Sequence, residues 1–146
     1  MYSIHEAILA SFYMNPRYKV WLGQAKFDLD AAVSAAQNGF YEWACFISEQ
    51  CAEKAIKSII VANSQIAPKI HKLSALVNIA KRADHSFAQV NFPIRELGVF
   101  TFIARYPFLI PGELDAPHLY ITLEDARLCI DKATKILNTI ESSLKG

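Results

Sequence analysis

The sequence predicts an all-α fold, an up-and-down bundle of about five helices in a single domain spanning residues 1–146. Apolar residues recur at spacings of three and four in several segments, and no segment alternates apolar and polar residues as a strand does. Glycine and proline gather between the periodic segments. At 146 residues the chain can close one hydrophobic core but not a second one.

The first clear helix is expected over residues 17–37. Its apolar side chains fall on one stripe, which consists of Tyr18, Leu22, Ala25, Leu29, Val33 and Ala36. Asn38 and Gly39 should end it, because both residue types tolerate the left-handed backbone that closes a helix. Residues 1–14 carry Glu6 and no basic region before a short apolar stretch, which favours an opening helix over a signal peptide.

A second helix is expected over residues 41–63, with one apolar face and one face in water. The apolar face should hold Ile47, Cys51, Ala52, Ala55, Ile56 and Ile59. The wet face should hold Glu42, Glu49, Glu53, Lys54 and Lys57. Glu53 and Lys57 are four residues apart in the favourable order, which predicts an exposed ion pair worth a few tenths of a kcal/mol.

Two shorter helices and two connectors should follow. Residues 64–70 contain Pro68 and predict a loop. A third helix, ending near Ala83, is indicated by Leu73, Leu76, Val77 and Ala80, and residues 84–91 form a polar connector. Pro93 suits the first turn of a fourth helix over residues 94–105, whose apolar residues on nearly every face predict burial on several sides.

Residues 105–121 predict an ordered proline-rich loop, because Pro107, Pro111, Gly112 and Pro117 exclude a regular helix. The side chains expected to hold this loop against the body are Phe108, Leu109, Ile110 and Leu119. Thr122 and Asp125 resemble a capping box that opens the last helix. That helix carries Ala126, Cys129, Ile130, Ala133, Ile136, Leu137, Ile140 and Leu144 in register.

Composition restricts the class of protein. Hydrophobic residues make up 53% and charged residues 20%, which excludes disorder and leaves apolar surface for an oligomer. A net charge of +1 provides no global field for DNA, RNA or an anionic membrane, and the apolar run 97–104 is too short to cross a bilayer. Cys45, Cys51 and Cys129 are interpreted as reduced core thiols of a cytoplasmic protein.

Several kinds of site are absent from the sequence. The five glycines are scattered, so there is no P-loop, and no Glu-x-x-His pair supports a di-iron bundle. Asp28 and Asp30 lie on opposite sides of a helix and are interpreted as a solvated surface pair. We therefore expect no metal and no cofactor.

Three stretches in this order and spacing resemble the HEPN family: WLGQAKFDL at 21–29, GFYEWACFISEQCAEKAIK at 39–57, and ARYP at 104–107 ahead of TLEDA at 122–126. His71, Lys72 and Leu73 resemble the family's usual entry into its third helix. The resemblance implies a compact bundle like the substrate-binding subunits of nucleotidyltransferases. Such proteins are commonly homodimers, found with nucleotidyltransferase partners or as RNA-cleaving toxins of toxin-antitoxin pairs.

The resemblance also implies how cleaving members work. In these members an Arg is followed four to six residues later by a His, and the two residues act across a dimer cleft. Arg105 matches the Arg position, but Leu109, Ile110 and Pro111 stand where the His should be, and His118 lies too far along. RNA cleavage without metal needs a proton acceptor and a group that stabilises the phosphorane. No catalytic residue is therefore assigned, and no efficient RNase activity is expected.

The candidate ligand-binding residues are Arg105, Tyr106, His71, His118 and Lys57. Each has a purely structural alternative: the histidines can be caps or surface residues, Arg105 can pair with a carboxylate or with helix-terminal carbonyls, and Lys57 can be solvated. The aromatic side chains of Phe100, Phe102, Tyr106 and Phe108 favour a subunit interface over a base-stacking platform.

The leading hypothesis is a non-catalytic HEPN-type homodimer that binds a nucleotide-like anion near Arg105, or a nucleotidyltransferase partner. A divergent metal-independent RNase toxin using His118 is the first alternative. A purely structural dimerisation module is the second. The expected partners are another copy of the chain, a nucleotidyltransferase, and a nucleotide or RNA, but neither DNA nor a membrane.

Overall fold

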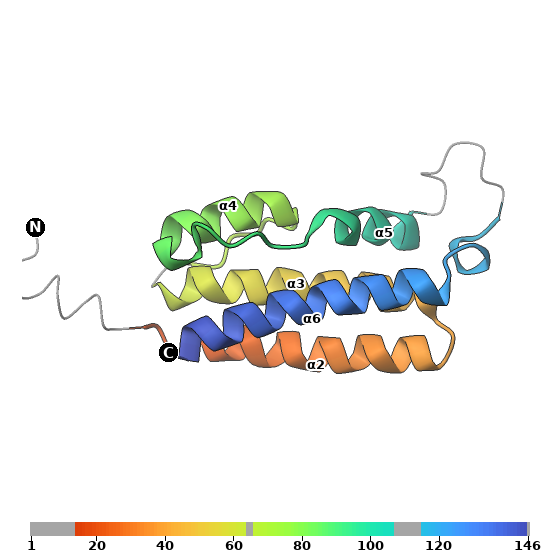
Figure 1. Ribbon diagram of the computed structural model, residues 1–146, viewed down its shortest axis with the longest axis horizontal. Helices are drawn as coiled ribbons and strands as arrows, with labels where there is room; N and C mark the ends of the chain where they lie inside the picture. Colours follow the sequence, from red (N-terminus) through yellow and green to blue (C-terminus); the bar gives the residue numbers. More distant parts are fainter. Residues whose placement is uncertain (1–13, 64–65, 107–114, 146) are drawn as a thin grey trace, which may run out of the picture.

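The computed structural model describes residues 14–63, 66–106 and 115–145, and in these residues the chain forms five α-helices and no strand (Figure 1). The helices are α2 (Tyr18–Gln37), α3 (Tyr41–Ala62), α4 (Leu73–Ala83), α5 (Arg95–Arg105) and α6 (Leu123–Lys145). Their bounds agree closely with the predicted ranges, so the predicted all-α bundle is confirmed.

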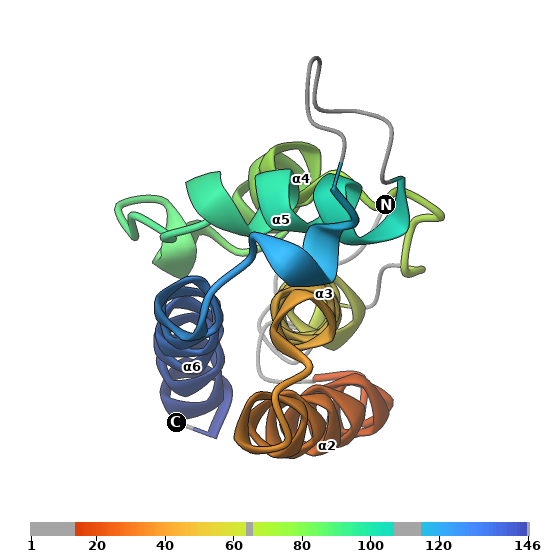
Figure 2. The ribbon, with the colours of Figure 1, turned by 90° about the vertical axis from the view of Figure 1, so that its right-hand side faces the viewer.

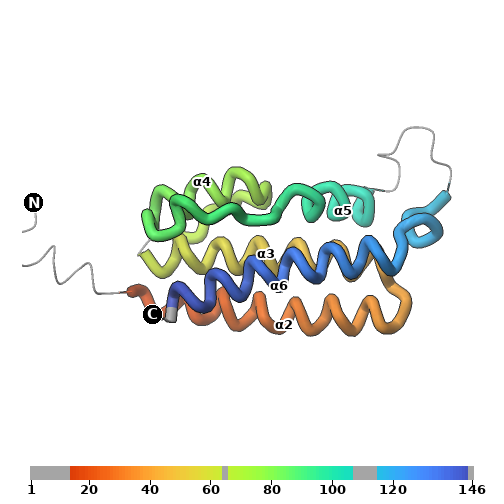
Figure 3. The backbone as a smooth tube through the Cα atoms, viewed as in Figure 1, coloured from red at the N-terminus to blue at the C-terminus, as the bar shows by residue number. Residues whose placement is uncertain are grey.

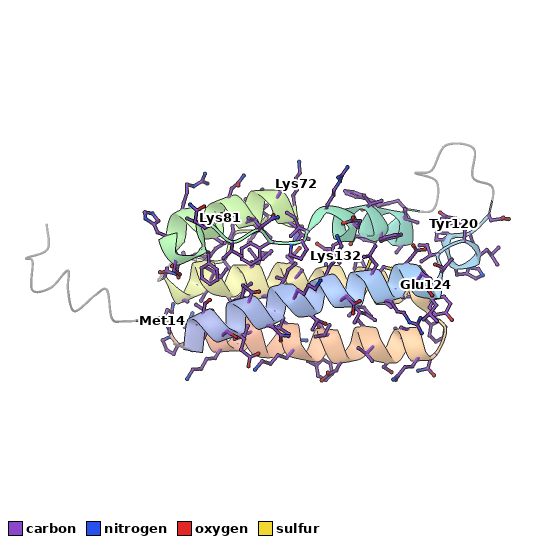
Figure 4. All side chains as sticks on the ribbon, in the orientation of Figure 1. Met14, Lys72, Lys81, Tyr120, Glu124 and Lys132 are labelled. Carbon is purple, nitrogen blue, oxygen red and sulfur yellow. The ribbon has the colours of Figure 1, made fainter. Side chains whose placement is uncertain are left out.

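The middle of the molecule is occupied by α3, which contacts α2, α4, α5 and α6. Figure 2 looks along the bundle and shows α2 below α3, α6 beside them, and α4 and α5 on the side of α3 away from α2. The tube in Figure 3 shows that α4 and α5 follow one another along the same edge of α3. Lys132 of α6, labelled in Figure 4, pairs with Glu96 of α5.

Local signals in the sequence explain where the helices begin and end. Gly39 has φ +82°, the left-handed conformation that glycine adopts without strain, and it separates α2 from α3 as predicted. The predicted polar connector after α4 instead contains a 3-10 turn, His85–Phe87. Asp84 caps this turn, because its carboxylate accepts a hydrogen bond from the backbone N–H of Ser86 at 3.0 Å. Phe87 in this turn is buried and stacks on Phe92.

The capping box predicted for the last helix is present. The Thr122 hydroxyl accepts from the Asp125 backbone N–H at 3.2 Å, and the Asp125 carboxylate accepts from the Thr122 backbone N–H at 2.9 Å. Two backbone donors at the start of α6 are therefore satisfied by side chains.

Thr122→Ala is expected to lower the free energy of unfolding by about 1 kcal/mol, because one end of this reciprocal cap is lost. Urea denaturation measures the change. Ser143→Ala, on the exposed side of α6, is the matched control and should change stability by less than about 0.5 kcal/mol. Equal effects of the two substitutions would contradict a capping role.

The prediction of a wet face on α3 is wrong for most of its charged residues. Side chains expected in water are instead buried, namely those of Glu42, Glu49, Glu53 and Lys57. The reason is the central position of α3, which is covered by four neighbouring helices rather than by one or two. The predicted Glu53–Lys57 ion pair does form, at 3.2 Å, but inside the protein.

Two predictions about α2 are also wrong. Asp28 is not a solvated residue, because its side chain is largely buried and its carboxylate lies 2.5 Å from Lys54 Nζ of α3. Val33, expected on the core stripe, is exposed, whereas Ala32 is buried. The stripe shifts by one residue because α2 packs closely on both α3 and α6, and the small side chain of Ala32 faces them.

The prediction that α5 is buried on several sides is wrong as well. Only Leu97 and Thr101 of this helix are buried, whereas Val99 and Phe102 are more than half exposed. A single face of α5 meets the bundle because the helix lies at its edge.

Leu119, expected to hold the proline-rich loop against the body, is 64% exposed. The predictions on residues 1–13 and 107–114 lie outside the described residues.

The three cysteines are free and buried, as predicted for core thiols. A hydrogen bond to Cys129 and then burial raise the pKa of Cys45. Burial raises the pKa of Cys51 to about 12, which keeps this thiol protonated and unreactive near neutral pH. Among the described helices, none combines the length and apolar content that crossing a membrane requires.

Candidate functional site

A hollow of about 650 Å³ lies between α3, α5 and the segment that enters α4. It is lined by Phe46, Glu49, Gln50, Glu53, His71, Lys72, Leu73, Gly98, Thr101, Phe102 and Arg105. Figure 4 shows Lys72 where α4 begins, beside the start of α5. We call this hollow the α3–α5 cavity.

Two helical faces form the walls of the cavity. Positions 46, 49, 50 and 53 come from α3, and positions 98, 101, 102 and 105 come from α5. Each set has the spacing of one helix face. The faces run in opposite directions, because Arg105 at the end of α5 lies over Phe46 near the start of α3. The Arg105 end and the Glu53 end of the cavity are thus separated by roughly 10 Å of helix.

Arg105 is held by aromatic rings. Its guanidinium carbon lies 5.7 Å from the centre of the Phe46 ring and 5.5 Å from that of Tyr106, both within the range of cation–π attraction. Arg105 forms no ion pair with any carboxylate among the described residues. An exposed guanidinium placed in this way keeps its charge and its N–H groups available for an anion.

Glu49 is a buried carboxylate in the wall of the cavity, with 4% of the residue exposed. Gln50 Nε2 donates to its Oε2 at 2.9 Å, and Thr101 lies in the facing wall of the cavity with its hydroxyl donating to the Leu97 carbonyl at 3.0 Å. Burial, and then the nearby charge of Glu53, raise the pKa of Glu49 to about 7, although hydrogen bonding and Arg105 oppose this shift. Glu49 therefore changes its charge close to neutral pH.

A chain of side-chain contacts leads from Trp21 to His71, at the Glu53 end of the cavity. Lys57 Nζ lies over the Trp21 ring at 5.7 Å and donates to Glu53 Oε2 at 3.2 Å. Glu53 Oε1 lies 3.2 Å from His71 Nδ1. An ionised carboxylate can only accept hydrogen bonds, so His71 carries its proton on Nδ1 in this arrangement and its Nε2 stays available.

Replacing Glu49 with glutamine should stabilise the protein in a pH-dependent way. The pKa of Glu49 is about 7 in the folded state and 4.5 ordinarily, so its contribution to stability is full below pH 4.5 and is lost as the pH rises through 7. Glu49→Gln removes this loss, and we expect about 1–3 kcal/mol of added stability at pH 8 and much less at pH 5. Urea unfolding at both pH values measures it, and an equal difference at the two pH values would contradict the account.

A second hollow, of about 290 Å³, lies elsewhere on the molecule. Its lining residues are Ile60, Ile66, Pro68, Ile79, Arg82 and Ala83. Among the described residues that line it, Arg82 is the one charged side chain, and no aromatic ring or polar network accompanies it. The α3–α5 cavity therefore remains the better candidate, and Arg82 provides a control arginine.

The structure brings together some of the residues singled out from the sequence. Arg105 and His71 line the α3–α5 cavity, Tyr106 contacts Arg105, and Lys57 reaches the cavity through Glu53. His118 lies exposed on the 3-10 turn Pro117–Leu119 and is not among the residues that line the cavity.

Sequence reasoning missed Glu49 as a site residue and assigned it to solvent. The available signal was the spacing of Phe46, Glu49, Gln50 and Glu53, which places an aromatic ring and three polar groups on one helix face. No group of three potential ligands suited to a metal occurs among the described residues.

Comparison with known proteins gives consistent matches over nearly the whole chain. The HEPN domain model matches residues 18–143. The chain is 30% identical over 139 residues to MJ1304 of Methanocaldococcus jannaschii, a protein named as a toxin candidate, and the match covers 90% of this chain and 91% of that protein.

Two solved structures are similar as well. TT1696 from Thermus thermophilus is 28% identical, with a TM-score of 0.70. ST0689, described as an archaeal HEPN homologue, is 34% identical, with a TM-score of 0.61. Each comparison covers 88% of this chain and 98% of the other.

Proposed function

The chain belongs to the HEPN domain family, and we propose that it is a binding module of this family that holds a nucleotide-like anion at Arg105 without cleaving RNA. The observation that carries the proposal is the position of the Arg105 guanidinium and its lack of an ion-pair partner among the described residues. Two rings hold its guanidinium at one end of a cavity, and no carboxylate of the described residues neutralises it by an ion pair.

The cavity suits a ligand of this kind in size and chemistry. Its volume falls within the range of small-molecule sites, and its walls combine apolar surface with a few polar groups. Arginine binds phosphate oxygens with two parallel N–H donors. The exposed ring of Phe102 offers a face on which a nucleobase can stack.

The arrangement of polar groups supports binding over cleavage. Arg105 lies at the Phe46 end of the cavity, whereas His71 pairs with Glu53 at the other end, roughly 10 Å of helix away. A general base and the group that stabilises the phosphorane must act on the same phosphate. Within one protomer, His71 and Arg105 do not converge in this way.

The test is the binding of ATP, of GTP and of an end-labelled single-stranded RNA to the purified chain. We expect saturable binding of the nucleotides, no cleavage of the RNA, and loss of binding by at least about tenfold in Arg105→Ala, because a charge-assisted bidentate contact is removed. Arg82→Ala removes an arginine outside the cavity and should bind as wild type does. Unchanged binding in Arg105→Ala would overturn the proposal.

One relative supports a second candidate function, that of a ribonuclease toxin. The similarity to MJ1304, named as a toxin candidate, favours it, and so does the ring of His71, which Glu53 orients. In this function the His71 of one protomer would act as the base beside the Arg105 of the other. Growth arrest on expression, abolished by His71→Ala or by His118→Ala, would establish this function. Our proposal predicts no arrest.

We also propose that the module is a homodimer, which its exposed apolar residues support. Val20 and Phe27 are seven residues apart on α2, so they lie on one face of this helix, and each is more than half exposed. Apolar surface of this kind is typical of an interface. A nucleotidyltransferase partner stays a prediction of the family resemblance. If the chain binds neither a nucleotide nor RNA, a purely structural dimer is the function that remains.

A further inference from the structure

The chemistry of the α3–α5 cavity changes from one end to its middle. Arg105 is a cation at the Phe46 end. Glu49 lies one helical turn further along α3, and its buried carboxylate is an acceptor. A ligand that reaches both groups must therefore be anionic at one end and carry hydrogen-bond donors at the other.

The carboxylate of Glu49 is held in place by its neighbour on α3. Gln50 Nε2 donates to its Oε2 at 2.9 Å, whereas the Thr101 hydroxyl in the facing wall donates to the Leu97 carbonyl at 3.0 Å. An ionised carboxylate has about four lone-pair sites, so acceptor capacity remains after the contact with Gln50. A second phosphate would be repelled here, whereas an uncharged N–H edge would be bound.

Among the common nucleobases, guanine presents two adjacent donors, N1–H and the 2-amino group, on its Watson–Crick edge. Adenine and cytosine present an amino donor beside a ring acceptor, and uracil presents one donor between two acceptors. We propose that the α3–α5 cavity selects guanine nucleotides, with the phosphate on Arg105 and the N1–H and 2-amino groups donating to Glu49. This inference rests on the proposed function.

The ionised form of Glu49 is the one that recognises guanine in this way. The charged groups that face it are Glu53 on the same helix, Arg105 on α5, and His71 and Lys72 in the segment before α4. Because the pKa of Glu49 is about 7, the acceptor pair is complete at pH 8 and is lost as the pH falls. Affinity for guanine nucleotides should therefore rise from pH 6 to pH 8.

The experiment is calorimetric titration of the full chain at pH 8 with GMP, IMP and AMP. IMP keeps N1–H and lacks the 2-amino group, so it separates the two donors. GMP should bind about tenfold or more tightly than AMP, with IMP between them. In Glu49→Gln the advantage of GMP should disappear, whereas Glu124→Gln, an exposed carboxylate on α6, should retain it.

The outcomes separate this inference from the proposed function. Equal affinities for GMP and AMP that both fall in Arg105→Ala would overturn guanine selection and leave the anion-binding function standing. A GMP advantage that persists in Glu49→Gln would also overturn the role of Glu49. No binding of any nucleotide would overturn both. If Glu49→Gln does not fold, the order of affinities of the wild type for GMP, IMP and AMP, and the pH dependence of that order, still decide the inference.

Discussion

Lys57→Met is expected to lower the free energy of unfolding by about 3–5 kcal/mol, the usual effect of removing one partner from a buried ion pair. The substitution leaves the buried carboxylate of Glu53 with His71 alone, whose side chain is largely exposed. It also removes the ammonium group from the Trp21 ring. Urea denaturation at pH 7 measures the loss.

Two further variants separate the lost ion pair from a general loss of packing. In the double variant Glu53→Gln and Lys57→Met no unpaired carboxylate remains, so part of the lost stability should return. Lys135→Met changes an exposed lysine of α6 and should have an effect below about 0.5 kcal/mol. A loss below about 1 kcal/mol for Lys57→Met would contradict the burial of this pair.

Ile136→Ala is expected to cost about 2–5 kcal/mol, because it removes buried methyl and methylene groups and leaves a cavity. Ile136 is fully buried on α6, which packs against the central helix α3. Thermal and urea unfolding both report the change. The control is Leu128→Ala on the same helix, whose side chain is 39% exposed and should cost less than half as much. Equal losses at the two positions would show that α6 does not pack by the face described.

The ends of the helices could be predicted because the signals are local. Gly39 needs a left-handed conformation that few other residues adopt without strain, and Thr122 and Asp125 satisfy each other's backbone donors within four residues. Such signals do not depend on the rest of the fold. The predicted resemblance to the HEPN family, based on ordered stretches along the chain, is confirmed for the same reason.

The burial of charged residues could not be predicted in the same way. A helix with Glu49, Glu53 and Lys57 on one side is typical of a half-exposed position, and that interpretation holds when a helix has one or two neighbours. In this bundle α3 has four neighbours among the described helices. How many neighbours a helix has depends on the tertiary arrangement, and periodicity does not report it. The converse error, on α5, has the same origin, since its apolar residues Val99 and Phe102 face outward at the edge of the bundle.

The candidate site was therefore predictable only in part. Arg105 was singled out because it matches a family motif, and His71 because of its position after the second helix. Glu49 enters the site only when α5 is placed against α3, with Thr101 facing it. His118 was singled out as the histidine that follows Arg105 in the chain, although it lies too far along for the family spacing, and in space it does not line the cavity.

In the proposed function, the α3–α5 cavity binds a nucleotide through Arg105. The most direct measurement is an NMR titration of the uniformly ¹⁵N-labelled chain with GTP, which reports every backbone amide separately. We predict that the signals that shift cluster in residues 46–53, 71–73 and 98–105, and that Arg105→Ala abolishes these shifts. Shifts confined to the hollow around Ile79 and Arg82, or no shifts at all, would contradict it.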